Sequence, residues 1–506
     1  GLSNLSLESN NGDLTVVEID ASTLQPLTTI DLSAKGTLDN GSNAAIIVNS
    51  ATGGINATLL GLSTVVSSVG ARINFAITTP DTGTINFTSE RTSGLISTIE
   101  NAGTQNLNQT STIILGDAAK DKTNDITISG IVDNISITGG SGQDEIKFGT
   151  SNKTKSIDLN LGTDFDKVDF SNIENANGTL VNNGLAINLG STNYNVQTNA
   201  LAPAQPGLSE NINSDIIESS TLAEFISGSK IGEGLSNENF VGQINNIEWV
   251  IGTSKNDFLI SDSKGAKLDG NSGDDNIVGG SNNDELIGGI GNDIIIGKEG
   301  DDKISGDNGN DTLTGGDGTD SLNGGAGNDT YRFNTGDVDS GESITEASSG
   351  GTDTVSIITS TDFANMSNAS FDEIDVINFG GASQTATFTG AQLTSETISL
   401  TETAAGTSNL VINVGAGTTA TLTNITAASS FTSGADTVTI NGSTGNETIT
   451  GPNIATTITG GAGTDTITGG TQADIIEGGD GADALVGGTG NDTYRFNTGD
   501  VDSGES

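Results

Sequence analysis

Residues 270–332 read GNSGDDNIV-GGSNNDELI-GGIGNDIII-GKEGDDKIS-GDNGNDTLT-GGDGTDSLN-GGAGNDTYR, seven consecutive units of nine residues. In every unit the first residue is Gly, the sixth is Asp, and the eighth is apolar or aromatic. The eighth positions are Ile277, Leu286, Ile295, Ile304, Leu313, Leu322 and Tyr331. A short unit repeated in phase without gaps predicts a protein that stacks one structural unit on the next.

The same pattern recurs elsewhere in the chain. Two degraded units lie in phase before the first block, GTSKNDFLI at 252–260 and SDSKGAKLD at 261–269. A second block of six units starts at Gly442, and its last four units keep the sixth-position Asp. An isolated unit, GGSGQDEIK, occupies 139–147, and the twenty residues 324–343 recur at 487–506 with one difference.

Glycine and strand geometry explain the nine-residue period. Glycine at positions one, two and four permits positive φ, so we expect a sharp turn there. The remaining residues make a short strand of about three residues, whose eighth-position side chain points into the core. Two units then form one coil of eighteen residues, and residues eighteen apart lie above one another at a strand spacing of ~4.8 Å. The predicted fold is all-β, with blocks of parallel β-roll or β-solenoid and additional β-rich segments.

Stacking of the coils places the sixth-position carboxylates in columns. Such like charges repel unless a hard cation with oxygen ligands lies between them, and Ca²⁺ fits turn carbonyls and carboxylates better than Mg²⁺ does. The candidate ligands are Asp257, Asp275, Asp284, Asp293, Asp302, Asp311, Asp320, Asp329, Asp465, Asp474, Asp483 and Asp492. The pairs predict roughly seven or eight Ca²⁺ ions. The alternative is that these are ordinary Asp and Gly turn residues.

Two departures from the pattern affect the expected affinity. Asn282 and Gln472 stand where the fourth-position Gly is expected, and Lys298 and Asp307 replace the second-position Gly. We expect the turns that carry these substitutions to bind the cation more weakly. The turn with Gln472 should be the weakest, since Asn tolerates positive φ better than Gln does.

The consensus GGxGxDxUx resembles the haemolysin-type calcium-binding repeat of RTX proteins, over about a quarter of the chain. The stretches NNIEWVIGTSKNDFLI (245–260) and LGTDFDKVDFSNIENANGT (161–179) resemble lead-in segments of bacterial, in particular cyanobacterial, RTX surface proteins. The resemblance implies a calcium-bound β-roll in a secreted or cell-surface protein.

Composition narrows the classes of function. The net charge of −48 disfavours binding to nucleic acid and to anionic membranes. The chain has no Cys and no His, which excludes disulfides, zinc–thiolate sites and histidine-based catalysis, and we expect no enzyme. The chain contains no run of eighteen apolar residues, so we expect no transmembrane segment. Aromatic residues make up 4%, so we expect a thin aliphatic core without a large aromatic cluster.

We expect five regions along the chain. Residues 1–138 form a β-rich N-terminal region and 139–251 a β-rich region with one RTX-like unit. Block one covers 252–343, a Thr-rich segment covers 344–441 as a β-domain or an irregular solenoid, and block two covers 442–506. The sequence NDTYRF closes each block, either as an aromatic cap over the exposed strand edge or as one more ordinary strand. Since the chain starts at Gly1 and stops inside a repeated stretch, we expect a piece of a longer modular protein.

The expected function is that of an extracellular, calcium-dependent structural repeat protein in a surface layer or a secreted surface filament. Its partners would be copies of itself, with cell-surface polysaccharide as a further partner. The main alternative is the repeat region of a secreted RTX adhesin or toxin whose active domain lies outside this sequence, and a polysaccharide lyase on a β-solenoid is a third. Ordered lattices or fibres in calcium favour the structural role, whereas haemolysis or glycan binding by the complete protein favours the adhesin or toxin.

Overall fold

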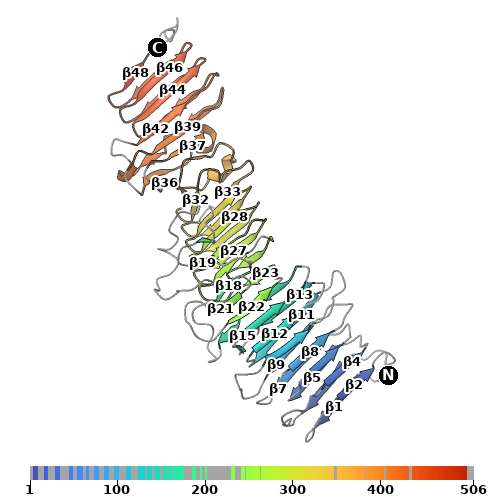
Figure 1. Ribbon diagram of the computed structural model, residues 1–506. Coiled ribbons are helices and arrows are strands. Elements are labelled where there is room, and N and C mark those ends of the chain that lie inside the picture. Colours follow the sequence, from blue (N-terminus) through green and yellow to red (C-terminus); the bar gives the residue numbers. More distant parts are fainter. Residues whose placement is uncertain are drawn as a thin grey trace. The chain divides into compact units, whose positions relative to one another are not determined.

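The computed structural model describes residues 247–497, apart from 262–263, 347–349, 382, 404–405 and 432–435. Before residue 247 it describes the strands and some residues next to them. Before Ile247, side chains are described at 137–138, 143–148, 159–162, 165–172, 187 and 189. The chain divides into two compact units, Gly1–Ile277 and Val278–Ser506. In both, nearly every element is a strand and most strands pair in parallel (Figure 1), which confirms the predicted all-β solenoid. The five predicted regions stay a prediction.

The first unit is a stack of coils, and each coil contributes one strand to each of two sheets. The strands of the first sheet are, in order, β1 (Asn4–Ser9), β3 (Thr29–Ala34), β5 (Gly54–Leu60), β7 (Ile73–Thr78), β9 (Ile96–Asn101), β11 (Thr123–Gly130), β13 (Gln143–Phe148), β16 (Lys167–Asp169), β23 (Trp249–Ile251) and β25 (Lys267–Asp269). The second sheet holds β2 (Val16–Asp20), β4 (Ala45–Asn49), β6 (Thr64–Ser67), β8 (Ile85–Ser89), β10 (Thr110–Ile114), β12 (Asn134–Thr138) and β15 (Ser156–Asn160). The strands of residues 1–138, expected to be β-rich, therefore belong to a parallel solenoid.

The regular stacking in the first unit is interrupted by an antiparallel insertion. Strand β21 (Lys230–Glu233) pairs antiparallel with both β18 (Leu185–Asn188) and β22 (Val241–Asn245). The parallel order resumes because β22 pairs with β15 and β18 pairs with β24 (Phe258–Ile260). The remaining strands of this unit are β14 (Asn152–Thr154) with β17 (Ile173–Asn175), and β19 (Tyr194–Asn195) with β20 (Ala200–Leu201). Strand β26 (Asn276–Val278) includes the last two residues of this unit and the first residue of the second.

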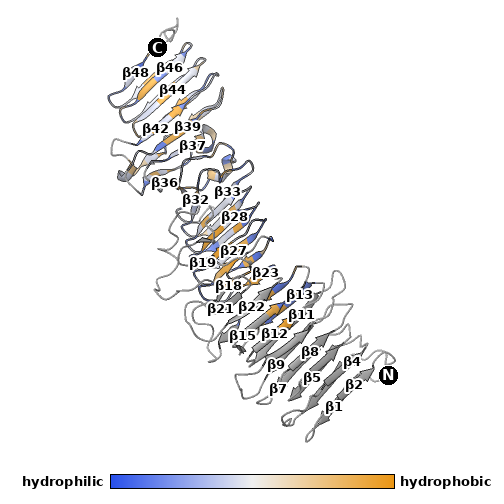
Figure 2. Cartoon of the chain, viewed as in Figure 1, coloured by the Kyte–Doolittle hydropathy of each residue, from blue (hydrophilic) through white to orange (hydrophobic). Residues whose placement is uncertain are grey.

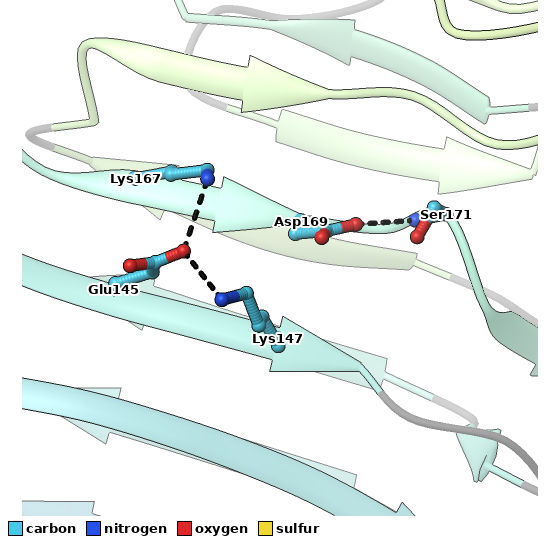
Figure 3. Close-up of polar contacts among 5 residues, drawn as sticks. All are labelled: Glu145, Lys147, Lys167, Asp169 and Ser171. Carbon is cyan, nitrogen blue, oxygen red and sulfur yellow. Dashed lines mark hydrogen bonds and ion pairs between the residues drawn. The ribbon is translucent and has the colours of Figure 1, made fainter. Parts of the chain in front are cut away.

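Polar side chains align on the outside of the first sheet. Glu145 of β13, Lys167 of β16, Trp249 of β23 and Lys267 of β25 are register partners on successive strands. The carboxylate of Glu145 forms ion pairs with Lys147 at 2.8 Å and Lys167 at 2.9 Å, and Asp169 accepts a hydrogen bond from the Ser171 N–H (Figure 3). The Lys167 and Lys267 ammonium groups lie 4.0 and 4.8 Å from the centre of the Trp249 ring. Each of these partly exposed contacts contributes little to stability.

In the second unit, block one has the predicted two-sheet coil. One sheet holds β27 (Glu285–Ile290), β29 (Lys303–Asn308), β31 (Ser321–Ala326) and β33 (Ser343–Thr345). The other begins with β28 (Ile294–Glu299), β30 (Thr312–Asp317) and β32 (Thr330–Phe333) and continues through β34 (Thr354–Ile357), β36 (Val376–Phe379), β38 (Ser399–Glu402) and β41 (Thr426–Ala427). Register partners such as Leu286 and Ile304 are eighteen residues apart, as predicted. The strands β27–β31 have six residues each, not three, because each strand extends through the first three residues of the next unit.

The core of block one is the predicted single stack of side chains. The eighth-position residues from Ile277 to Tyr331 are each at most 1% exposed. In β30 the apolar residue lies between two polar ones, whereas β28 begins with three isoleucines, and Figure 2 shows the apolar residues of these strands in orange.

The first-position glycines have a different role from the predicted one. Positive φ occurs at positions two and four, as at Gly289 and Gly291, and even at Lys298 and Asp307 in position two. No first-position Gly in the described part of either block has a positive φ. Space explains these glycines instead, because a Cβ on Gly297 would lie 2.2 Å from Asp302 Oδ2 and 2.6 Å from the Gly315 carbonyl oxygen.

We therefore expect Gly297→Ala to lower the free energy of unfolding by about 1–3 kcal/mol in saturating calcium, as overpacking does. The matched control is Gly415→Ala, whose Cβ would meet nothing closer than 3.7 Å, and which should change stability by no more than about 0.5 kcal/mol. Urea unfolding followed by circular dichroism measures both, and equal losses would contradict the spatial role of Gly297.

The Thr-rich segment is an irregular solenoid, one of the two predicted alternatives. Its coils are longer than eighteen residues: register partners are 22 apart at Thr354 and Val376, and 28 apart at Asn409 and Thr437. A third sheet starts here with β35 (Thr361–Asp362), β37 (Thr385–Thr389), β39 (Asn409–Asn413) and β42 (Thr437–Asn441), and continues in block two with β44 (Thr456–Ala462), β46 (Ile475–Asp480) and β48 (Thr493–Arg495). A fourth sheet holds β40 (Thr419–Thr421), β43 (Thr448–Thr450), β45 (Thr466–Gly470) and β47 (Ala484–Gly488).

Three short helical turns accompany this segment, η2 (Asn368–Phe371), α1 (Gly390–Leu393) and η3 (Ser429–Phe431). In α1 the Thr389 hydroxyl accepts a hydrogen bond from the Gln392 N–H while the Gln392 side chain accepts one from the Thr389 N–H, a capping box. No helix in the described part of the chain is long and apolar enough to cross a membrane.

The prediction of a core without a large aromatic cluster is wrong for the same segment. Phe363 stacks on Phe388 with ring centres 4.6 Å apart and contacts Phe333 and Phe371 edge to face at 5.1 and 5.9 Å. Phe379 stacks on Phe431 at 5.4 Å. A low average content of aromatic residues conceals this local concentration, because longer coils enclose a wider interior that large side chains fill.

The capping interpretation of NDTYRF is wrong for the first copy. Strand β32 pairs with β34 over Thr330–Phe333, so the solenoid continues and Tyr331 and Phe333 are at most 1% exposed. In the second copy Tyr494 and Phe496 are 42% and 53% exposed, and capping there stays a prediction.

Candidate metal centre

The predicted ligands lie at the same position of each nine-residue unit, immediately before a strand. Eleven of them are buried: Asp257, Asp275, Asp284, Asp293, Asp302, Asp311, Asp320, Asp329, Asp465, Asp474 and Asp483. Asp492 is half-buried. Burial of so many carboxylates without a compensating positive charge would be strongly unfavourable, so their partners decide what the site does.

Hydrogen bonds connect the carboxylates into columns. The N–H of Asp284 donates to Asp302 Oδ1 at 2.8 Å, and the N–H of Asp302 donates to Asp320 Oδ1 at 2.8 Å. The same bond joins Asp293 to Asp311 and Asp311 to Asp329, and it joins Asp257 to Asp275 within the first unit. In block two it joins Asp465 to Asp483 and Asp474 to Asp492. One oxygen of each acceptor therefore fixes its carboxylate to the main chain of the neighbouring coil.

The second oxygen is the one available to a cation. The Oδ2 atoms of Asp302, Asp311, Asp320, Asp329, Asp465 and Asp483 are buried and have no hydrogen-bond partner. Each lies against the first-position Gly of its own unit, as the short Cβ distances at Gly297, Gly306, Gly315 and Gly324 show. Buried anionic oxygens without donors, in a site with oxygen ligands only, fit Ca²⁺ and fit no soft metal.

Comparison with known families agrees with this geometry. Residues 269–304, 296–331 and 459–494 match the model of the RTX calcium-binding nonapeptide repeat (4 copies). The chain carries RTX repeats. Repeats of this family bind Ca²⁺ and are not catalytic, so this is a calcium-binding repeat protein. No curated protein matches the chain.

Two RTX turns are closed by the main chain instead. In the unit with Asn282 at position four, Asp284 Oδ2 accepts a hydrogen bond from the Gly280 N–H at 2.6 Å. In the unit with Gln472, Asp474 Oδ2 accepts one from the Gly470 N–H at 2.8 Å. Neither Asn282 nor Gln472 has positive φ, so the turn brings the second-position N–H toward the carboxylate. This supports the expectation that these two turns bind Ca²⁺ more weakly.

The start of block one is closed in the same way. Asp257 Oδ2 accepts a hydrogen bond from the Thr253 N–H at 2.5 Å, and the Thr253 hydroxyl lies 3.0 Å from Asp257 Oδ1.

A lysine supplies positive charge near the turn of Asp284. Lys298 Nζ donates to the Gly279 carbonyl oxygen at 2.7 Å. Burial lowers the pKa of this ammonium to about 8, against the opposing effect of the nearby Asp284, Glu299 and Asp302 carboxylates. Lys298, which stands where the repeat has Gly, thus places its ammonium group next to the turn in which Asp284 already accepts a hydrogen bond from the Gly280 N–H.

The carboxylate columns extend beyond the residues that the nonapeptide identifies. The Asp144 N–H donates to Asp166 Oδ1 and the Asp166 N–H to Glu248 Oε2 in the first unit. The Asp320 N–H donates to Glu342 Oε2, and the Asp329 N–H to Asp353 Oδ1. These residues were missed because they follow their partners by 22 residues or more. The signal that identifies them is an acid two residues before a buried aliphatic residue, as in Glu342-Ser-Ile344 and Asp353-Thr-Val355.

Burial and mutual repulsion make these carboxylates hard to ionise without a cation. Burial raises the pKa of Asp302, Asp311 and Asp320 to about 7, and neighbouring carboxylates act in the same direction. Burial raises the pKa of Glu342 to about 9, with Asp320 adding to the shift. Protons and Ca²⁺ therefore compete for the same oxygens.

These pKa values predict how stability depends on pH in calcium-free buffer. A carboxyl with a folded pKa of about 7 and an unfolded pKa of about 3.9 stabilises the fold fully below pH ~3.9, and this stabilisation is lost as the pH rises through ~7. Without calcium, block one should therefore keep more β-structure at about pH 5.5, which still lies above the pI of about 4.1, than at about pH 8, where protons no longer neutralise the columns. Circular dichroism of the chain in EDTA over this pH range checks this. A gain of β-structure with rising pH in calcium-free buffer would contradict the assigned direction, and in calcium the affinity should increase with pH.

Proposed function

We propose that this chain is an extracellular structural protein whose RTX blocks fold on binding Ca²⁺, and whose copies assemble into a surface layer or a surface filament. Copies of the same chain, and cell-surface polysaccharide, are the partners in this proposal. The observation that carries it is the set of buried carboxylate oxygens without partners along a parallel solenoid.

The residues that would hold Ca²⁺ are the sixth-position Asp residues whose Oδ2 is free, with turn carbonyls as further ligands. When bound, Ca²⁺ supplies positive charge that offsets the repulsion within each column. Asp302, Asp311 and Asp320 each fix one oxygen on the neighbouring coil and leave the other toward their own turn. Roughly seven or eight ions remain the proposed number, with the turns of Asp257, Asp284 and Asp474 as the weakest sites.

Charge supports a link between calcium and assembly. At a net charge of −48, copies of the chain repel one another at neutral pH. Saturation of the columns removes part of this charge and completes the coils, so contacts between copies become possible. The proposal therefore makes calcium a condition both for the folded blocks and for their association.

Sedimentation velocity and negative-stain electron microscopy of the full chain test the assembly. Samples in EDTA, in calcium, and in magnesium at equal ionic strength separate specific binding from charge screening. Ordered sheets or fibres in calcium alone would support the proposal. A chain that folds in calcium and stays monomeric at all concentrations would contradict the structural role and leave calcium binding intact.

A further inference from the structure

Three carboxylates meet where block one joins the Thr-rich segment. Asp329 precedes β32, Glu346 follows β33 and Asp353 precedes β34. One carboxylate oxygen from each of them lies within 4.8 Å of the others. Ligands on opposite sides of one Ca²⁺ are ~4.6–5.2 Å apart, because Ca–O distances are ~2.3–2.6 Å. The three side chains are thus close enough to share a single ion.

The orientation of the three groups is fixed from the main chain. Asp329 is fully buried, and its Oδ1 accepts a hydrogen bond from the Asp311 N–H at 2.8 Å. Asp353 is 2% exposed, and its Oδ1 accepts one from the Asp329 N–H at 2.9 Å. The Tyr331 hydroxyl accepts a hydrogen bond from the Gly324 N–H at 2.7 Å and donates one to Glu346 Oε1. Tyr331 therefore positions the third carboxylate.

Two oxygens of this cluster lack any hydrogen-bond partner. They are Asp329 Oδ2 and Glu346 Oε2, and both atoms are buried. A Cβ on Gly324 would lie 2.5 Å from Asp329 Oδ2 and 2.6 Å from both Glu346 Oε1 and the Tyr331 hydroxyl oxygen, so the carboxylates of Asp329 and Glu346 approach each other beside Gly324. The charges acting on Glu346 are the like charges of Asp353 and Asp329. The unpartnered oxygens of Asp329 and Glu346 thus lie among like charges, and a cation bound there would offset the repulsion.

We propose that Asp329, Glu346 and Asp353 form an additional Ca²⁺ site, separate from the sites made by pairs of nonapeptide turns. Two of its three ligands lie outside the RTX repeats. Bound there, the ion connects the last strand of block one to the segment that enters β34. The site thus couples the calcium-dependent block to the irregular solenoid. In the second copy of the repeated twenty residues, Asp492 and Tyr494 correspond to Asp329 and Tyr331.

Counting bound ions on the full chain tests the site. In equilibrium dialysis against calcium, the double variant Glu346→Gln/Asp353→Asn should bind one ion fewer per chain than the unmodified protein. The matched control is Asp372→Asn/Glu373→Gln, which removes the same charge from two exposed acids and should bind the full number. An unchanged number in the first variant would overturn the proposal.

Crystals of the unmodified chain soaked in terbium provide a test that does not depend on folding of the variant. Anomalous scattering should place an ion among Asp329, Glu346 and Asp353. Filled nonapeptide turns with no ion at this cluster would overturn the inference and leave the proposed function standing. No ion at any turn would contradict the proposed function itself.

Discussion

In the Asp302→Ala variant, the calcium concentration at the midpoint of folding is expected to rise by about tenfold or more. Asp302 Oδ2 is buried without a hydrogen-bond partner and is a proposed Ca²⁺ ligand, and Asp302 Oδ1 accepts the hydrogen bond of the Asp284 N–H. The substitution removes a ligand and leaves that N–H without an acceptor, at a cost of about 1–3 kcal/mol for the donor alone. Each 1.4 kcal/mol corresponds to about a factor of ten in affinity. A calcium titration of the full chain followed by circular dichroism measures the midpoint.

Two further variants test whether the effect of Asp302→Ala comes from the loss of a Ca²⁺ ligand or only from the loss of a negative charge. Asp301→Ala removes the adjacent, exposed carboxylate, whose Oδ1 accepts a hydrogen bond from the exposed Thr319 N–H, and should move the midpoint clearly less than Asp302→Ala does, because solvent can replace that bond. Asp257→Ala should shift it less than Asp302→Ala does, because the Asp257 carboxylate already has the Thr253 N–H as a donor. Equal shifts for Asp302→Ala and Asp257→Ala would count against the columns as cation sites.

Phe363→Ala is expected to lower the free energy of unfolding of the Thr-rich segment by about 3–5 kcal/mol, whether or not calcium is present. Phe363 is fully buried and contacts the rings of Phe333, Phe371 and Phe388. An apolar core of this kind needs no cation. Urea unfolding in EDTA and in calcium measures the loss.

The control for this prediction is the same residue type at an exposed position. Phe496 is 53% exposed, so Phe496→Ala should change stability by no more than about 0.5 kcal/mol. A loss for Phe363→Ala that occurs only in calcium would show that the ions also hold the Thr-rich segment together.

The repeat period alone was sufficient to predict the coil of block one. Gly, Asp and an aliphatic residue at fixed positions determine the turn, the column and the core, so Leu286, Ile304 and Leu322 stack as expected. The sequence did not reveal that Asp302 Oδ1 accepts a hydrogen bond from a main-chain N–H and that only Oδ2 lacks a hydrogen-bond partner. This arrangement depends on how the Asp284 N–H is oriented in the neighbouring coil.

Outside the repeats, coil length varies and the sequence loses its phase. Asp353 joins the column of Asp329 across 24 residues, and Glu342 joins that of Asp320 across 22. A fixed spacing cannot identify such partners, since the extra residues loop out of the coil. The aromatic cluster around Phe363 was missed for a related reason. Its members come from strands and a helical turn far apart in sequence, and only the folded coil brings them together.

Hydrophobic burial is too small to hold the RTX blocks together without a cation. Each unit of block one buries one eighth-position side chain, worth about 1.5–3 kcal/mol. Ordering the backbone of its residues costs roughly 1–2 kcal/mol per residue. The free carboxylate oxygens add repulsion, so the balance depends on bound Ca²⁺, and folding and metal binding become one process.

Hydrogen exchange of the full chain, resolved by segment and compared between EDTA and calcium, tests this dependence most directly. We predict that the amides of β27–β31 and of β44–β47 exchange rapidly in EDTA and become protected in calcium. The amides of β37 and β39, beside the aromatic core, should be protected in both. Equal protection of β27–β31 in EDTA and in calcium would contradict the account, because the ions would then add nothing to the stability of the coils that contain their ligands.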